Sequence, residues 1–419
     1  MTNVPETVKG MRDFLPEEKI LRDEVINKIK TVFEIYGFSP LETPALESKE
    51  LLTGKGQYGD EALKLIYDFK DKAGREIGLR YDLTVPLARV IASNKNLPKP
   101  FKRYAIDKVW RYESPQKGRY REFYQCDIDT IGAAGSLADA ELLACANDAL
   151  LVIGLNKFTF RINSRKLMNE ILKSAGIEES KISKTLRTLD KADKIGEQNV
   201  AKELRTFLSE SAVFSVLETM KLKGEWNRIS QKLKASTETK KEIDEFLEYL
   251  SNLGVRNYVF DLSLARGLDY YTGFVFEIDA GVGISVGSGG RYDKLIEVYS
   301  GENTPATGIS LGFERLISLL KNSEKKTTAE IFVIPINTLK ASLQIVGELR
   351  KNGINTDFDL LGRNISKNLD YVNKQKIPYA LFVGEKELSL GKVKLKDMKS
   401  GDEELMSVTK LIEKLTYRK

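Results

Sequence analysis

The sequence contains no histidine, only two cysteines, and no long apolar run. Without imidazole, a Ser-His-Asp triad is excluded, and two cysteines that stand apart in sequence do not complete a zinc site. Cys126 and Cys145 also cannot build a disulfide framework, which favours a reducing compartment and therefore the cytoplasm. No segment approaches the roughly 20 apolar residues that span a bilayer, and the N-terminal segment has no apolar core, so we expect neither membrane insertion nor secretion.

Positive charge is concentrated in one segment. The formal net charge is +6, and residues 99–121 contain eight Lys or Arg and two Asp or Glu, so the rest of the chain is balanced. Most such runs are solvated faces, but this composition also suits a polyphosphate or a nucleic acid. On charge alone both interpretations stay open.

The hydrophobic periodicity predicts an α+β fold with an antiparallel sheet. Residues 17–36 carry a helical apolar stripe, and residues 84–93 and 136–153 predict two further helices. Most of the remaining sequence between 63 and 131 has strand character and is joined by turns and loops. No G-x-G-x-x-G stands between a strand and a helix, so a Rossmann nucleotide site has no support.

Composition divides the chain into four parts. Residues 166–255 have helical patterns and predict an insertion that divides the sheet domain, leaving residues 1–165 and 256–321 as its two parts. The segment "KNSEKKTTA" is a charged linker. Residues 328–419 then alternate β and α patterns, which predicts a small α/β domain.

The segment "VWRYESPQKGRYREFYQCDID" places Arg111 and Glu113 on one face of a strand. An arginine fork can hold a phosphate, a glutamate can accept a base amino proton, and Phe123 can stack on a purine. A simple hairpin with a cross-strand ion pair is the alternative. Three cations of or beside the loop could close over phosphates or an RNA end: Lys117, Arg119 and Arg121.

Two further segments carry chemistry. In "GISLGFERLISLL", Arg315 opens a helix directly after a strand, where it either reaches a terminal phosphate or is an ordinary surface arginine. "ARGLDYYTG", Ala265 to Gly273, brings together a cation, a carboxylate and two tyrosines. Such a set of side chains fits a site for a small polar ligand better than it fits a buried strand.

These pieces together resemble the signature motifs of class II aminoacyl-tRNA synthetases. The order "GMRDFLP", "LRYDLTVPLAR", "RYESPQKGRYREFYQCDID", "RGLDYYTG" and "SGGRYD" resembles the histidyl-tRNA synthetase family over nearly the whole chain, in an archaeal or eukaryotic style. The resemblance implies a class II catalytic domain of antiparallel sheet over 1–165 and 256–321. It also implies a C-terminal α/β anticodon-binding domain over 328–419.

The resemblance further implies ATP-dependent ligation of L-histidine to tRNA(His) through a histidyl-adenylate. The implied ligands are ATP with Mg²⁺, L-histidine and tRNA(His), without zinc or an organic cofactor. A homodimer is implied by the helix at 17–36 and the segment around Pro44. The alternatives are a synthetase-like regulatory paralogue of histidine biosynthesis without charging activity, and a class II synthetase for another amino acid.

Site residues follow from the same resemblance. ATP would be bound by Arg111, Glu113, Phe123 and Arg315. Histidine would be bound by Asp82, Thr84, Gln125, Asp129, Arg266, Tyr270 and Tyr271. In that set Asp82, Thr84 and Gln125 hold the α-ammonium, Asp129 and Tyr271 bond the imidazole nitrogens, and Tyr270 packs. The catalytic cations would be Arg111 and Arg266, and Lys117, Arg119 and Arg121 would meet the tRNA end.

The absence of histidine also limits what titrates near neutrality. Apart from the α-amino terminus and any perturbed carboxylate or thiol, few side chains of this enzyme should change charge between pH 5 and 8. The imidazole of the substrate, with a pKa near 6.5, should then dominate the pH dependence of activation.

Overall fold

The computed structural model describes residues 4–54, 64–116, 118–265, 271–281, 283, 285–320 and 325–416. Contacts divide the chain into two units, Met1–Arg12 with Val25–Leu320, and Asp13–Glu24 with Lys321–Lys419. The division near residue 320 falls close to the predicted linker, whereas the assignment of Asp13–Glu24 to the second unit was not predicted. The domain boundaries proposed from sequence stay predictions.

The first unit is built on one large sheet, which confirms the predicted α+β class. In the described residues it has nine strands in the order β1-β5-β6-β12-β11-β10-β7-β9-β8. The neighbours from β5 to β7 are antiparallel, whereas β1–β5 and β7–β9 are parallel. The strands are β1 (Ser39–Pro40), β5 (Phe101–Trp110), β6 (Glu122–Ile131), β7 (Thr159–Ser164), β8 (Lys223–Gly224), β9 (Tyr258–Asp261), β10 (Phe274–Asp279), β11 (Ser285–Arg291) and β12 (Ala306–Gly312).

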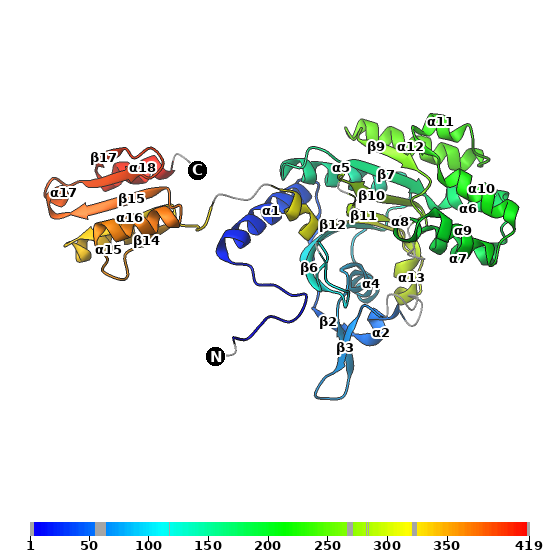
Figure 1. Cartoon of the computed structure of the whole chain (residues 1–419), viewed down its shortest axis with the longest axis horizontal. Coiled ribbons are helices and arrows are strands. Elements are labelled where there is room, and N and C mark those ends of the chain that lie inside the picture. The colour runs from blue at the N-terminus through cyan, green and yellow to red at the C-terminus, as the bar shows by residue number, and fades with distance from the viewer. Residues whose placement is uncertain are drawn as a thin grey trace. The chain divides into compact units, whose positions relative to one another are not determined.

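Helices cover both faces of this sheet (Figure 1). α5 (Ser136–Val152) contacts β6 and β12, while α4 (Thr84–Ser93) and α13 (Asp293–Ser300) pack together in a cluster with Tyr271 and Tyr292. The helices predicted at 17–36, 84–93 and 136–153 are confirmed as α1 (Pro16–Ile35), α4 and α5. The short α14 (Phe313–Leu319) follows β12.

A second sheet, of three strands, is formed by residues that precede β5 in the sequence. Its order is β2-β4-β3, with both pairs antiparallel. Its elements are β2 (Leu46–Ser48), α2 (Lys49–Leu52), β3 (Tyr67–Lys70) and β4 (Glu76–Leu79). The Ser48 hydroxyl accepts a hydrogen bond from the Leu51 amide and so caps α2.

The segment between β7 and β9 is helical, as predicted, apart from β8. Its helices, green in Figure 1, are α6 (Arg165–Ser174), α7 (Glu179–Leu189), α8 (Ala192–Ile195), α9 (Glu197–Arg205), α10 (Glu210–Met220), α11 (Trp226–Ser230) and α12 (Thr237–Asn252). β8 pairs with β9 at the edge of the main sheet. Two residues are too short a strand for sequence alternation to reveal.

The C-terminal residues form a separate α/β layer structure. In the described part its sheet order is β14-β13-β15-β16-β17, with β14, β13 and β15 parallel and the last two strands antiparallel. The elements are β13 (Ile331–Ile336), α15 (Leu339–Lys351), β14 (Thr356–Phe358), α16 (Ile365–Lys374), β15 (Tyr379–Gly384), α17 (Glu385–Ser389), β16 (Val393–Asp397), β17 (Glu403–Met406) and α18 (Val408–Thr416). Buried side chains cover both faces of β13 and β15, as expected for central parallel strands. No helix in the described residues is long and apolar enough to cross a membrane.

Aromatic stacking joins α12 to the main sheet. The ring of Phe246 stacks on Phe274 with centroids 4.1 Å apart and lies 6.2 Å from Phe276. All three side chains are buried. This contact ties α12 to β10.

We predict that Phe246→Ala lowers the free energy of unfolding by about 3–5 kcal/mol, because it removes a fully buried ring and leaves a cavity. Phe214→Ala is the matched control, since that ring on α10 is 70% exposed and its loss should cost within about 0.5 kcal/mol. Denaturant unfolding of both variants measures the difference. Equal, small losses would contradict this packing.

Candidate active site

Strand β6 carries three polar side chains on one face of the main sheet. Alternation places Gln125, Asp127 and Asp129 on the same face of β6. Across β5 they lie opposite Asp107, Ala105 and Arg103, and across β12 opposite Gly312, Ser310 and Gly308. The other face of β6, which carries Cys126 and Ile128, is buried towards α5.

Asp129 is held by two buried partners. Nη2 of Arg103 lies 2.7 Å from its Oδ2, and the Tyr292 hydroxyl donates a hydrogen bond to its Oδ1. Arg103 and Asp129 are 1% and 2% exposed, and Arg103 also donates to the Leu83 carbonyl at 3.0 Å. Burial raises the pKa of Asp129, although Arg103 and the Tyr292 hydroxyl act in the opposite direction. The predicted imidazole ligand is therefore fixed in position by its neighbours.

The close approach of β12 to β6 explains why residue 308 is a glycine. A Cβ added to Gly308 would lie 2.0 Å from Oδ1 of Asp129 and 3.0 Å from the Ile128 carbonyl oxygen. Because such contacts are sterically impossible, the Asp129 carboxyl occupies the space that a side chain at 308 would fill. Tyr271, the predicted partner of Asp129 in imidazole recognition, is buried in the same cluster as Tyr292.

Asp127 and Gln125 form a second polar group beside this pair. Nε2 of Gln125 donates to the Ser310 hydroxyl at 2.8 Å, and Ser310 also bonds the Asp127 carboxyl. The pKa of Asp127 is raised to about 7, mainly by burial; Asp129 and Asp82 contribute to the rise, while Arg103 and Ser310 oppose it. Oδ1 of Asp127 and Oε1 of Gln125 are buried without a hydrogen-bond partner among the described residues.

Asp82 lies at the beginning of α4. Its Oδ1 accepts hydrogen bonds from the amides of Thr84 at 3.2 Å and Val85 at 3.0 Å. Burial raises the pKa of Asp82, and these amides and the Arg111 guanidinium lower it. The predicted ammonium ligands Asp82 and Thr84 are therefore ordered by the first turn of one helix.

The prediction that Arg111 and Glu113 lie on a strand is wrong, because β5 ends at Trp110 and both residues follow it. Arg111 lies beside the aromatic ring predicted to stack on adenine. Its Nε donates to the Tyr81 carbonyl at 2.9 Å, and its guanidinium is 5.2 Å from the centroid of Phe123. Val109 of β5 pairs with Phe123 of β6. Phe123 packs against the small buried cluster of Leu83, Ala105 and Val109. Arg111 is thus held where one edge of its guanidinium can face a ligand.

The basic loop is organised by Arg121. Its Nε donates to the Glu113 carbonyl at 3.0 Å, and its guanidinium lies 4.3 Å from the Tyr112 ring. Arg119 is exposed and pairs by its backbone with Gln116 at the loop tip. These contacts give Arg121 a structural task in addition to the predicted one at the tRNA end, which stays a prediction.

The beginning of α14 meets the N-terminal segment. Glu314 is buried, accepts from the Tyr124 amide at 3.4 Å, and pairs with Nη2 of Arg12 at 2.6 Å. Arg12 also lies 3.4 Å from the Tyr120 ring centroid. Arg315 donates to the Ser285 carbonyl. Arg12 of the segment "GMRDFLP" therefore contacts α14 next to Arg315, a predicted ATP ligand.

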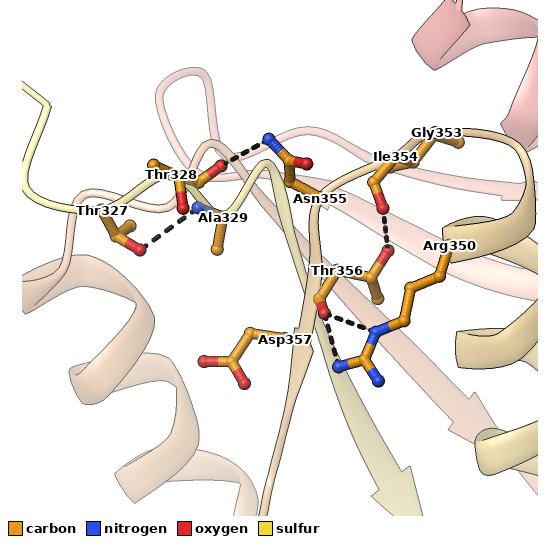
Figure 2. Close-up of a pocket in the computed structure, with 9 residues that line it drawn as sticks. All are labelled: Thr327, Thr328, Ala329, Arg350, Gly353, Ile354, Asn355, Thr356 and Asp357. Atoms are coloured by element: carbon orange, nitrogen blue, oxygen red, sulfur yellow. Dashed lines mark hydrogen bonds between the residues drawn. The ribbon is translucent and has the colours of Figure 1, made fainter. Parts of the chain in front are cut away.

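A hollow in the C-terminal unit is the other candidate. It lies where β13 and β14 begin and α15 ends (Figure 2). Arg350 donates to the Thr356 carbonyl at 3.1 and 2.9 Å, and Asn355 donates to the Thr328 carbonyl at 3.1 Å. None of the predicted site residues lines this hollow, so the candidate site is on the main sheet.

The structure places Asp82 near Arg111 and Arg111 near Phe123, and it links Asp129 with Tyr271 through Tyr292, which bonds Asp129 and is buried in one cluster with Tyr271. Arg266, Tyr270 and Lys117 lie outside the described residues. Sequence reasoning did not identify four side chains of the polar face, Arg103, Asp127, Tyr292 and Ser310. The period of two along β6 could have indicated Asp127, because it stands midway between Gln125 and Asp129.

An antiparallel sheet that carries this motif hairpin, with an α/β layer in the C-terminal residues, is the architecture of a class II aminoacyl-tRNA synthetase. A family model described as histidyl-tRNA synthetase matches residues 10–316, and one described as an anticodon binding domain matches residues 330–418. The chain belongs to the histidyl-tRNA synthetase family. This confirms the predicted family and the predicted C-terminal anticodon-binding domain.

Individual relatives agree over nearly full length. A histidine--tRNA ligase of Thermococcus kodakarensis is 40% identical over 431 residues, covering 98% of each chain. The crystal structure of histidyl-tRNA synthetase from Nostoc sp. PCC 7120 matches at a TM-score of 0.87, with 32% identity and 99% of each chain covered. An ATP phosphoribosyltransferase regulatory subunit/histidyl-tRNA synthetase from Bacillus halodurans matches at 0.75, with 24% identity, 87% of this chain and 96% of that chain. The last similarity concerns the fold alone.

We predict that Gly308→Ala destabilises the first unit by about 1–3 kcal/mol or more, because the new methyl group must displace the Asp129 carboxyl. Gly347→Ala is the control: its added Cβ meets nothing within 4 Å, and alanine favours the helix α15. Denaturant unfolding followed by circular dichroism compares the two. A Gly308→Ala protein as stable as the original would contradict the close approach of β12 to Asp129.

Proposed function

We propose that this protein joins L-histidine to tRNA(His), using ATP and passing through a histidyl-adenylate. The observation that carries the proposal is the buried Asp129 carboxyl, held by Arg103 and Tyr292 beside Tyr271. An acid and a phenol placed close together suit the two nitrogens of an imidazole ring. Unpaired buried groups would make apolar amino acids of similar size poor substrates.

The first step is attack of the histidine carboxylate on the α-phosphorus of ATP. The P–O bond to pyrophosphate breaks, and pyrophosphate leaves with its electron pair. Negative charge grows on the α-phosphoryl oxygens, so cations fixed before the reaction stabilise the transition state. We assign this task to Arg111, which the Tyr81 carbonyl orients, and to Arg266.

The remaining ATP contacts come from the motif strands and α14. Phe123 would stack on adenine, Glu113 would accept from its amino group, and Arg315 would bind the γ-phosphate. Mg²⁺ would enter with the triphosphate and neutralise part of its charge. The described residues contain no cluster of three Asp, Glu or Cys suited to a metal, so no protein ligand is assigned to it.

The second step transfers histidine to the terminal adenosine of the tRNA. A ribose hydroxyl attacks the carbonyl carbon of the adenylate, and AMP leaves. Because the chain has no imidazole, the hydroxyl proton must go to a phosphate oxygen or a carboxylate. Lys117, Arg119 and Arg121 would guide the tRNA end, and the domain at 330–418 would bind the anticodon.

A regulatory paralogue without charging activity is the alternative. The presence of Arg111, Glu113 and Arg315, together with a match to an anticodon binding domain, favours the synthetase. A regulatory protein would need neither an ATP site nor tRNA recognition. A class II synthetase for another amino acid is disfavoured by the family to which the chain belongs.

Exchange of labelled pyrophosphate into ATP across a panel of amino acids tests the proposal. We expect exchange with L-histidine alone, together with charging of tRNA(His) when tRNA is added. Exchange with a different amino acid would point to another class II specificity. No exchange at all by a folded protein would favour the regulatory alternative.

Arg111→Ala should lower kcat for histidine activation on the order of 10²–10³-fold, since its partner charge develops in the transition state. Arg111→Lys should recover only part, because an ammonium lacks the planar fork. Arg75→Ala, at an exposed arginine, is the control and should leave activation unchanged. Near-normal kcat with a raised KM for ATP would reduce Arg111 to a binding residue.

We also propose that the protein is a homodimer of the cytoplasm. The support for the dimer is the helix confirmed as Pro16–Ile35 and the segment around Pro44, which resemble the family's dimer elements. Light scattering should give twice the mass of the 419-residue chain at assay concentrations. A monomer mass with full charging activity would refute the dimer.

A further inference from the structure

Asp127 is a buried carboxyl group that the steps above leave without a role. It lies on β6 between Gln125 and Asp129, on the same face of the strand. Its side chain is 3% exposed, and Oδ1 has no hydrogen-bond partner in the described part of the chain. A buried polar atom without a partner is rare in folded proteins, so this oxygen requires an explanation.

The surroundings of Asp127 carry an excess of negative charge. The groups that face it are Arg103 of β5, Asp129 of β6, Ser310 of β12, Asp82 before α4 and Tyr292 after β11. Among these groups, three carboxyls with Asp127 included lie near the Arg103 guanidinium, and the Arg111 guanidinium also acts on Asp82. Like charges in a buried site disfavour ionisation unless a cation joins them, so the site favours a cationic ligand.

The oxygen of the neighbouring amide indicates the kind of cation. Oε1 of Gln125 is also buried and unpartnered among the described residues, while its Nε2 is bound to Ser310. A primary ammonium has three N–H donors and no acceptor, and so matches two free acceptor oxygens. A phosphate or carboxylate, which offers acceptors alone, does not match them.

We propose that Asp127, together with Gln125, binds the α-ammonium group of the amino-acid substrate and loses a proton to solvent when the ammonium arrives. This inference rests on the proposed function and adds a specificity-determining residue to it. No covalent bond between heavy atoms changes. The neutral carboxyl of the free enzyme becomes a carboxylate in the complex, and the proton passes to the buffer.

The direction of the pH effect follows from burial. The pKa of Asp127 is raised to about 7, so the free enzyme carries the neutral acid below that pH. A bound ammonium favours the carboxylate and lowers the pKa, so the complex holds fewer protons than the free enzyme. Affinity for the ammonium should therefore rise with pH up to about 7 and then level off.

Calorimetric titration in buffers of different ionisation enthalpy counts the released protons. The two ligands are L-histidine and 3-(imidazol-4-yl)propionate, which keeps the ring and the carboxylate but lacks the ammonium. At pH 6 we expect the original protein to release close to one proton per site more than the Asp127→Asn variant on binding the same L-histidine, so that the titration of the ring cancels, and the difference to vanish by about pH 8.5. Equal proton counts at every pH would overturn the proposal.

Asp127→Asn keeps the shape of the side chain and removes its titration. This variant should show no extra proton release, and its affinity for histidine at pH 8 should fall about 10- to 100-fold. Its affinity for the des-amino compound should change little. Asp107→Asn, at a carboxylate of β5 paired with Arg80, is the control and should release protons as the original does.

The two proposals fail differently. If the original protein activates histidine but the Asp127→Asn variant releases the same protons, the role of Asp127 is refuted. The proposed function then remains intact. An original protein that does not support histidine-dependent pyrophosphate exchange would refute the proposed function, and this inference with it.

Discussion

A guanidinium and a carboxylate, Arg103 and Asp129, face each other 2.7 Å apart inside the main sheet, and the candidate site is arranged around them. Removing two charges from water costs several kcal/mol for each ion, and attraction offsets this only when the geometry is fixed. The Leu83 carbonyl fixes Arg103, and the Tyr292 hydroxyl fixes Asp129. Gly308 leaves room for the carboxyl. Strands β5, β6, β11 and β12 therefore have to assemble before the pair is stable.

The same arrangement sets the electrostatics near neutral pH. Burial raises the pKa of Asp127 to about 7 and that of Asp139, which pairs with Arg291, to about 6. The described part of this chain, which has no imidazole, thus includes at least two carboxyl groups in the range where histidines usually titrate. The sequence predicts that the substrate ring dominates this pH range unless a carboxylate has a perturbed pKa. Asp127 is such a carboxylate. The pH dependence of activation should contain both the substrate ring and this acid.

Local signals were sufficient for the elements and for the motif residues. Amphipathic spacing located α1, α4 and α5, and alternation with turn signals located β5 and β6. The position of Phe123 follows from the hairpin, in which it pairs with Val109, whereas Arg111 and Glu113 follow the end of β5 and are not strand partners.

The buried partners could not be found in this way. Arg103 stands in a run of positive charge, where an exposed side chain is the ordinary expectation. Tyr292 lies far from Asp129 in sequence, so their contact depends on the order of strands in the sheet. β8 has two residues and no pattern, and its pairing depends on the helices before it. Long-range pairing decides these features, and local propensity carries no information about it.

Arg103 and Asp129 stabilise the fold as one unit, and a double-mutant cycle on folding stability measures this coupling. Arg103→Met and Asp129→Leu alone should each lower the free energy of unfolding by about 3–5 kcal/mol, because each leaves a buried charge without its partner. The double variant should lose far less than the sum, since two apolar side chains leave no charge behind. Losses that simply add would contradict the account.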